Sequence, residues 1–140
     1  MFLPILSAYE LRKKQMSMHE IGLVNIKEIL GEEYFSNREK STSSFNRDMR
    51  ELTARYCFGD LWSRPGLDRR VRSMLVLAML AALGKGAEIK MHAVGAINNG
   101  CTVDEIKEVL LQAAVYAGIP AGVEAFKYAE QALRECGALE

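Results

Sequence analysis

The chain lacks an excess of either charge, a long uncharged apolar run and a recognisable export signal. Its 18 Lys and Arg balance 18 Asp and Glu, so no overall field draws in nucleic acid or an anionic membrane. No apolar run reaches the roughly 18–20 uncharged residues that span a bilayer. The opening residues MFLPILSAYELRKK have too short an apolar stretch and no small-residue cleavage site. We therefore expect a cytoplasmic protein that binds neither nucleic acid nor membrane.

Cysteine is also scarce. Cys57, Cys101 and Cys136 are an odd number at wide, irregular spacing. They form no C-x-x-C pair and no Cys/His cluster with zinc spacing, so we expect no metal site. Three reduced thiols, two of them packed as small apolar groups, are the simplest interpretation. Cys57 lies near an arginine-rich segment and is the one expected beside a pocket.

What the chain does contain is helical periodicity almost throughout. Its 140 residues suit one domain with one core, and no segment alternates as a strand would. We therefore predict an all-α fold, a compact bundle of about six to seven helices. An N-terminal helical arm would cover about residues 1–44, and the core about residues 45–137.

Glycine, proline and capping residues set the expected helix boundaries. The expected helices cover, in chain order, residues 7–30, 44–58, 67–83, 87–98, 102–117 and 120–136. The first has a break near Gly22 and stops at Gly31. The polar stretch 36–44 (SNREKSTSS) is expected to be a loop or an extended arm. Thr102 and Glu105 have the spacing of a capping box.

The apolar surface exceeds what one small domain covers. The segment VRSMLVLAMLAAL, within the helix expected over residues 67–83, is apolar on every side, which is typical of a central helix wrapped by others. The final helices (AAVYAGIPAGVEAF) are rich in Ala and Gly, which permit close backbone approach. We therefore predict an obligate homo-oligomer. The helix over residues 44–58 carries apolar side chains at helical spacing: Phe45, Met49, Leu52 and Tyr56.

Three unusual segments follow one another between Gly59 and Gly122. They read GDLWSRPGLDRRVRS, EIKMHAVGAINNG and TVDEIKEVLLQAAVYAGIPAG. The first concentrates four arginines beside Trp62, the second carries His92 among small residues, and the third ends in a Gly-Ile-Pro turn. Together they predict a buried, cation-lined pocket with one imidazole, suited to a small anion.

These segments resemble the gamma-carboxymuconolactone decarboxylase family. The elements W-S-R-P-G-L, K-M-H and A-V-Y-A-G-I-P carry the resemblance over about residues 55–130, and ILGEEYF carries it more weakly. The resemblance implies an alkylhydroperoxidase D-like fold with intertwined subunits, typically a hexamer built as a trimer of dimers. It also implies cofactor-independent decarboxylation of a lactone dicarboxylate in the beta-ketoadipate pathway of aromatic catabolism. We accordingly expect no cofactor, and a small anionic molecule as substrate.

The implied reaction needs a proton donor. Loss of carbon dioxide leaves an electron pair that the conjugated lactone delocalises, and a proton must then reach carbon. His92 is the expected donor, because imidazole cycles between acid and base near neutral pH. Glu88, one helical turn earlier, would orient the ring or raise its pKa. The competing interpretation is a partly buried histidine with a solvated glutamate.

Arg64 and Arg72 are the expected carboxylate clamps, since guanidinium binds carboxylate bidentately. Arg72 opens a helix that otherwise looks buried, so its charge needs a partner. The competing interpretation is a salt bridge to Asp60, Asp68 or Glu88. Arg69 and Arg70 are expected to be solvated or intersubunit. The predicted catalytic set is His92, Glu88 and Arg72, and the predicted substrate-binding set is Arg64, Trp62, Tyr56 and Cys57.

The chain departs from the family where an anion would bind. The segment Tyr56–Asp60 begins with tyrosine, where the family usually has a histidine before its aromatic-Gly-Asp element. Val94 stands where the family has an arginine, and Ile26 with Lys27 stands where it has a pair of basic residues. Fewer cations bind a dianion less well, which favours a paralogue acting on a less charged or larger lactone or enol substrate. The family reaction itself remains the other possibility.

Two further classes compete. The alkylhydroperoxidase D branch needs a C-x-x-C pair before its histidine, and here Lys85 and Glu88 occupy those positions. Without a resolving thiol we expect no peroxidase activity. The other alternative is a non-catalytic oligomer that binds a small metabolite in the same pocket.

Overall fold

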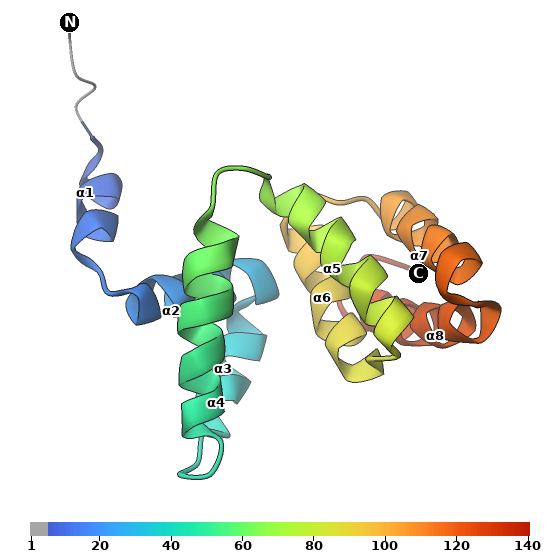
Figure 1. Cartoon of the computed structure of the whole chain (residues 1–140), viewed down its shortest axis with the longest axis horizontal. Helices are drawn as coiled ribbons and strands as arrows, with labels where there is room; N and C mark the ends of the chain where they lie inside the picture. The colour runs from blue at the N-terminus through green and yellow to red at the C-terminus, as the bar shows by residue number, and fades with distance from the viewer. Residues whose placement is uncertain (1–5) are drawn as a thin grey trace, which may run out of the picture.

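In the computed structural model, which describes residues 6–140, every regular element is helical (Figure 1). The elements are α1 (Ala8–Gln15), α2 (Met18–Leu30), α3 (Glu32–Lys40), α4 (Arg47–Leu52), the π-helix η1 (Thr53–Asp60), the 3₁₀ turn η2 (Leu61–Ser63), α5 (Arg69–Leu83), α6 (Gly86–Asn98), α7 (Val103–Ala117) and α8 (Ile119–Glu135). The predicted all-α fold is confirmed, with eight α-helices in this part of the chain instead of six to seven. No helix among residues 6–140 has the length and apolar character needed to cross a membrane.

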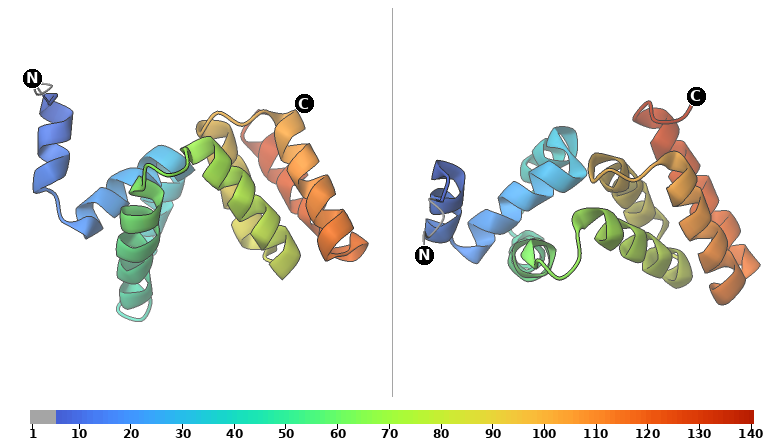
Figure 2. Two further views of the ribbon diagram at one scale, coloured as in Figure 1. Left: turned by 45° about the horizontal axis from the view of Figure 1, so that its top comes forward. Right: turned by 90° about the horizontal axis from the view of Figure 1, so that it is seen from above.

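The helices form two groups that meet along α5 and α6. Figures 1 and 2 show α1–α4 and η1 on one side and α5–α8 on the other. One buried cluster lies within α5–α8 and the segment after α6, with members such as Leu77, Ile89, Ile106, Leu110, Ala125 and Ala129. A second cluster joins α2 to η1 and η2 through Ile26, Ile29, Leu30, Ala54, Phe58 and Trp62. Val76 of α5 and Met91 of α6 pack against this second cluster, so helices of the second group also cover it.

The contact between α2 and η1 is a direct backbone approach. A Cβ added to Gly22 would lie 1.8 Å from the Ala54 carbonyl oxygen, and one added to Gly59 would lie 2.3 Å from that of Met18. Side chains larger than hydrogen do not fit at either glycine. The two glycines therefore set how deeply η1 sits against α2.

Two boundary predictions in this region are wrong. The break expected near Gly22 falls earlier, where Ser17 caps α2 through a capping box with Glu20; Gly22 serves close packing and does not end a helix. The stretch 36–44 is not a loop over its first half, because α3 continues to Lys40. The first turn of α3 carries acidic residues and its last turn carries basic ones, and both interact favourably with the helix dipole.

Much apolar surface stays open in the single chain. The expectation that residues 67–83 form a helix wrapped on all sides is wrong here, since Leu75, Met79 and Leu83 of α5 are 43%, 59% and 68% exposed. The helix formed by α4 and η1 turns its small and aromatic side, Ala54 and Phe58, inward. The apolar positions predicted for this region all face solvent: Phe45, which precedes α4, and Met49, Leu52 and Tyr56.

We predict that Gly22→Ala destabilises the protein. The added methyl has to displace the Ala54 carbonyl, and overpacking of this kind costs about 1–3 kcal/mol, more than the ~0.5–1 kcal/mol gained from helix propensity. Urea unfolding followed by circular dichroism measures the change. Gly66→Ala is the control, because nothing lies within 4 Å of its would-be Cβ. Equal unfolding free energies for the two variants would contradict the close packing of α2 on η1.

Candidate active site

His92 lies in an aromatic cluster that three elements build. It projects from α6 and is 7% exposed. Its ring is nearly parallel to that of Phe58 from η1, with centroids 6.4 Å apart, and to that of Trp62 from η2, at 6.2 Å. Phe58 and Trp62 also stack on each other at 6.1 Å. These three side chains are called the aromatic cluster below.

Burial dominates the electrostatics of His92. Removal from water disfavours the imidazolium and lowers the pKa of His92 from 6.5 to about 4, an effect that the nearby Glu88 carboxylate offsets in part. The imidazole is therefore neutral at neutral pH. Its Nδ1 atom is buried and has no hydrogen-bond partner within residues 6–140. A buried polar atom without a partner is costly, and a bound ligand is one way to satisfy it.

Arg72 also has an unsatisfied atom. This half-buried residue in the first turn of α5 donates from Nη2 to the Arg64 carbonyl oxygen at 3.2 Å. Its Nε atom is buried without a partner in the described chain. The ion pairs formed by residues 6–140 do not include Arg64 or Arg72. The competing interpretation of a salt bridge to Asp60, Asp68 or Glu88 is therefore not what the structure shows.

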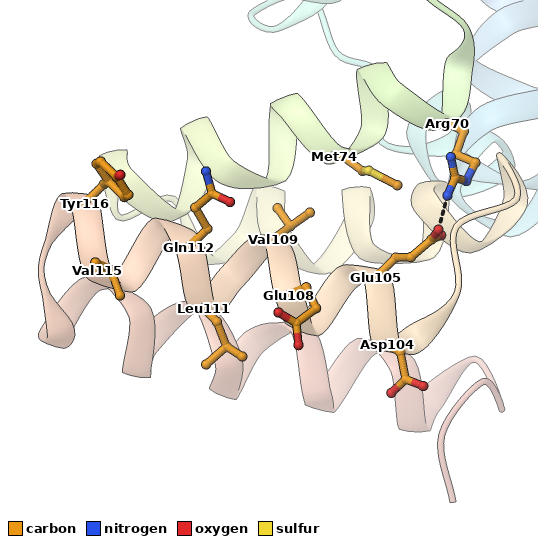
Figure 3. A pocket seen from close by; sticks show the side chains of 10 residues that line it. All are labelled: Arg70, Met74, Asp104, Glu105, Glu108, Val109, Leu111, Gln112, Val115 and Tyr116. Atoms are coloured by element: carbon orange, nitrogen blue, oxygen red, sulfur yellow. Dashed lines mark hydrogen bonds and ion pairs between the residues drawn. The ribbon is translucent and has the colours of Figure 1, made fainter.

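Arg69 and Arg70, which were expected to be solvated or intersubunit, are partly exposed and are ion-paired within the chain. Arg69 bonds Glu28 at 2.7 Å, and Arg70 pairs with Glu105. The second pair stands at one end of a groove of about 850 Å³ on α5 and α7 (Figure 3). Tyr116 and Val115 mark its other end. His92 does not line this groove, so its volume alone does not make it the site of chemistry.

The remaining predicted site residues differ in how far their side chains are buried. Trp62 is 5% exposed, and half-buried Cys57 packs against the same cluster as Trp62. Burial raises the pKa of the Cys57 thiol, which makes it a poor nucleophile. Glu88 and Arg64 are exposed, and Tyr56 is 74% exposed. The structure thus brings His92, Trp62 and Cys57 into one interior region and leaves the side chains of Tyr56 and Arg64 at the surface of the single chain.

Asn25 is a site residue that sequence reasoning missed. It is fully buried in α2, and its amide nitrogen donates to the Phe58 carbonyl oxygen and the Ser63 hydroxyl. A signal existed in the sequence: Asn25 sits on the helical face that also carries Gly22, Ile26 and Ile29. A polar residue at a core position needs partners, and here those partners are the ends of the segment that bears Trp62.

Comparison with known proteins places this arrangement in a family. The family described as the carboxymuconolactone decarboxylase family matches residues 47–131. A 4-carboxymuconolactone decarboxylase of Acinetobacter baylyi is 40% identical over 116 residues, which are 83% of this chain and 87% of the relative. A nitrosuccinic acid decarboxylase of Metarhizium robertsii is 39% identical over 114 residues, 81% of this chain and 80% of the relative.

An uncharacterised 15.0 kDa protein of Paracoccus denitrificans is 31% identical over 107 residues, 74% of this chain and 77% of the relative. The family match covers more than half of the chain, and the two named relatives align with most of it. Their shared activity is carboxy-lyase chemistry, and it fixes the class of enzyme. The chain therefore belongs to the carboxymuconolactone decarboxylase family and is a decarboxylase.

Proposed function

We propose that this enzyme decarboxylates a small anionic carboxylic acid without a cofactor, and that His92 delivers the proton that replaces carbon dioxide. The observation that carries the proposal is the buried imidazole, stacked in the aromatic cluster, with a buried Nδ1 that no residue in the described chain satisfies. A dry imidazole beside apolar walls suits proton transfer to carbon, because water is kept from the reacting centre.

The names of the two relatives favour one substrate class. 4-Carboxymuconolactone and nitrosuccinic acid are both acids that carry an electron-accepting group, a lactone in one and a nitro group in the other. When the bond to the carboxylate breaks, carbon dioxide leaves and the electron pair passes to that acceptor. Protonation at carbon completes the reaction. The substrate itself therefore supplies the electron sink, and no cofactor enters the balance.

The loss of cations restricts the expected class of substrate further. Three positions, Tyr56, Val94 and Ile26, differ from the pattern that the family resemblance implies, and two of them have lost a formal cation. We therefore favour a lactone or nitro acid less charged than a lactone dicarboxylate, handled by a paralogue of the beta-ketoadipate pathway enzyme. Arg72 is the carboxylate clamp that remains inside, since its Nε lacks a partner in residues 6–140, with Arg64 beside it at the surface.

Binding and protonation would be linked at His92. In the empty site the imidazole is neutral because burial lowers its pKa to about 4. A carboxylate brought within about 4–6 Å favours the charged form, so the substrate anion raises this pKa and recruits the proton that the reaction consumes. Glu88 acts in the same direction, which gives it the role of a tuning residue.

A homo-oligomer, by our proposal a hexamer, completes the assembly. A second groove of about 590 Å³ along α5 and α7 is lined by Val71, Leu75, Ala78, Met79, Val109 and Ala113, among others. The stripe of Met49, Leu52 and Tyr56 on α4 and η1 adds further exposed apolar side chains, and exposed apolar patches of this kind mark interaction sites. Further copies of the chain would cover the groove and this stripe. The three free cysteines suit a reducing compartment, and we retain the cytoplasm as the proposed location.

We predict that His92→Ala abolishes turnover. Carbon dioxide release is measured with 4-carboxymuconolactone and with nitrosuccinate. Loss of a general acid lowers kcat by about 100- to 10,000-fold, whereas His19→Ala, which removes the other histidine of the chain, retains the wild-type rate. Wild-type kcat in His92→Ala would refute the role of His92. A wild-type protein that decarboxylates neither these two dicarboxylic acids nor a lactone or nitro acid with a single carboxylate would favour the metabolite-binding alternative.

We predict that His92 makes the protein less stable in mild acid. The pKa of His92 is about 4 in the folded protein, against 6.5 for an ordinary histidine. Between pH 6.5 and 4, His92 is therefore protonated in the unfolded chain but neutral in the folded one. The free energy of unfolding therefore falls between pH 6.5 and 4, by a total on the order of 3 kcal/mol. Urea titrations across this range compare the wild type with His92→Gln, which lacks this slope. Parallel curves would show that His92 is solvated.

We predict that charge on the α5–α7 face breaks the assembly. Met79→Glu or Val115→Glu places a carboxylate where another copy would bury it, which costs several kcal/mol. Light scattering coupled to size-exclusion chromatography should show a lower subunit number for both. Lys127→Glu, at an exposed position of α8, is the control and keeps the wild-type mass. A monomeric wild type, or unchanged masses in both variants, would contradict the proposed interface.

A further inference from the structure

Asn25 uses its whole carboxamide to join three parts of the chain. Its Nδ2 atom donates to the Phe58 carbonyl oxygen at 2.7 Å and to the Ser63 hydroxyl at 2.9 Å, and its Oδ1 accepts from Arg69 Nη2 at 2.7 Å. The side chain is 0% exposed. Because guanidinium only donates and a carbonyl only accepts, these partners fix which end of the amide is which.

Two of these bonds grip the segment that carries the aromatic cluster. Phe58 lies in the last turn of η1, where carbonyl groups lack a following turn to bond. Ser63 ends η2, which contains Trp62. Asn25 therefore supplies a missing donor at one end of residues 58–63 and a second bond at the other. A π-helix that passes directly into a 3₁₀ turn is an uncommon backbone path, and it needs such support.

We propose that Asn25 is a positioning residue for the decarboxylation: its carboxamide holds residues 58–63 in place, so that Phe58 and Trp62 stay stacked against His92. The catalytic consequence rests on the function proposed above. The positioning itself does not, because it is visible in the surroundings of Trp62 and His92 without any turnover.

Arg69 locks the amide in turn. One arm of its guanidinium bonds Asn25, and the other bonds Glu28 at 2.7 Å. Glu28 also accepts from the Tyr9 hydroxyl at 3.2 Å, which ties α1 to the same network. The first arginine of α5 thus acts on the aromatic cluster through Asn25, which explains its ion pairing within the chain.

Removal of the Asn25 side chain should change the pKa of His92, which a general loss of packing elsewhere in the fold would not do. The buried Phe58 carbonyl loses its donor and the exposed Ser63 hydroxyl loses its link to α2, so the segment shifts until the Phe58 carbonyl reaches water. Water then reaches His92 and weakens the first cause of its low pKa, which is burial. Glu88, the charged group that acts on this imidazole from its own helix, stays in place, so the pKa of His92 moves toward its ordinary value.

Trp62 is the only tryptophan of the chain, so fluorescence excited selectively at tryptophan, beyond the absorption of the five tyrosines, reports on the aromatic cluster alone. Protonated imidazole quenches a stacked indole, and the midpoint of acid quenching follows the protonation of His92. We expect Asn25→Ala to shift the emission to longer wavelength and to raise this midpoint by about one pH unit or more. Ser63→Ala, which removes one bond from an exposed hydroxyl, should do the same to a smaller extent.

Asn98→Ala is the matched control. Its amide also donates to a backbone carbonyl between helices, that of Ile29 at 2.9 Å, but outside the aromatic cluster. It should keep the wild-type emission and midpoint even if its melting temperature falls. In turnover assays, kcat should change more than KM. The loss of kcat should be smallest for Asn98→Ala, larger for Ser63→Ala and largest for Asn25→Ala.

The proposal is overturned if Asn25→Ala and Ser63→Ala match Asn98→Ala in emission and midpoint, since Asn25 would then only stabilise the fold. If Asn25→Ala does not fold, Ser63→Ala decides alone by the same two readouts. If the wild type decarboxylates none of the acids offered, the proposed function fails, and the fluorescence measurements still decide whether Asn25 positions the aromatic cluster.

Discussion

Burial of one imidazole is the constraint on which the rest of the site depends. His92 lies against two aromatic rings from a different part of the chain, and its burial there lowers its pKa to about 4, so that it is neutral at neutral pH. An exposed histidine would be half-protonated near neutral pH in any case, and binding would then change little. Under the function that we propose, the arrival of a carboxylate raises the pKa of His92 and so recruits a proton.

The fold serves this burial by bringing α2, η1 and α6 to one place. Gly22 of α2 lets the backbone of η1 pack directly against the backbone of α2. Asn25, three residues after Gly22 on α2, donates a hydrogen bond to the last turn of η1. The aromatic rings of η1 and η2 then reach α6, while Val76 and Met91 close the interior between the two helix groups. The close packing and the buried amide are parts of one arrangement.

Sequence reasoning reached the fold class and several local features because they rest on short-range chemistry. The capping box of Thr102 and Glu105, the stop at Gly84 and the proline near the start of α8 are all present. The single histidine within the K-M-H element also proved to be buried next to the predicted Trp62. These features depend on residues a few positions apart, which a linear pattern contains.

Other features depend on contacts between distant segments and could not be read in this way. The π-helix leaves no periodic signature in eight residues, so the sequence did not show that Ala54 and Phe58 face inward while the apolar stripe from Phe45 to Tyr56 faces solvent. Gly22 looked like a helix stop because the sequence does not show that Ala54 lies against it. Asn25 was visible as a polar residue on an apolar face, but its partners, 33 and 38 positions away, were not.

The protonation of His92, followed by nitrogen NMR of the labelled imidazole, tests this account most directly. The account predicts a titration midpoint near 4 in the free protein, and a higher midpoint when the site is saturated with an unreactive dicarboxylate analogue. A midpoint near 6.5 in the free protein, or one that the bound anion leaves unchanged, would contradict it.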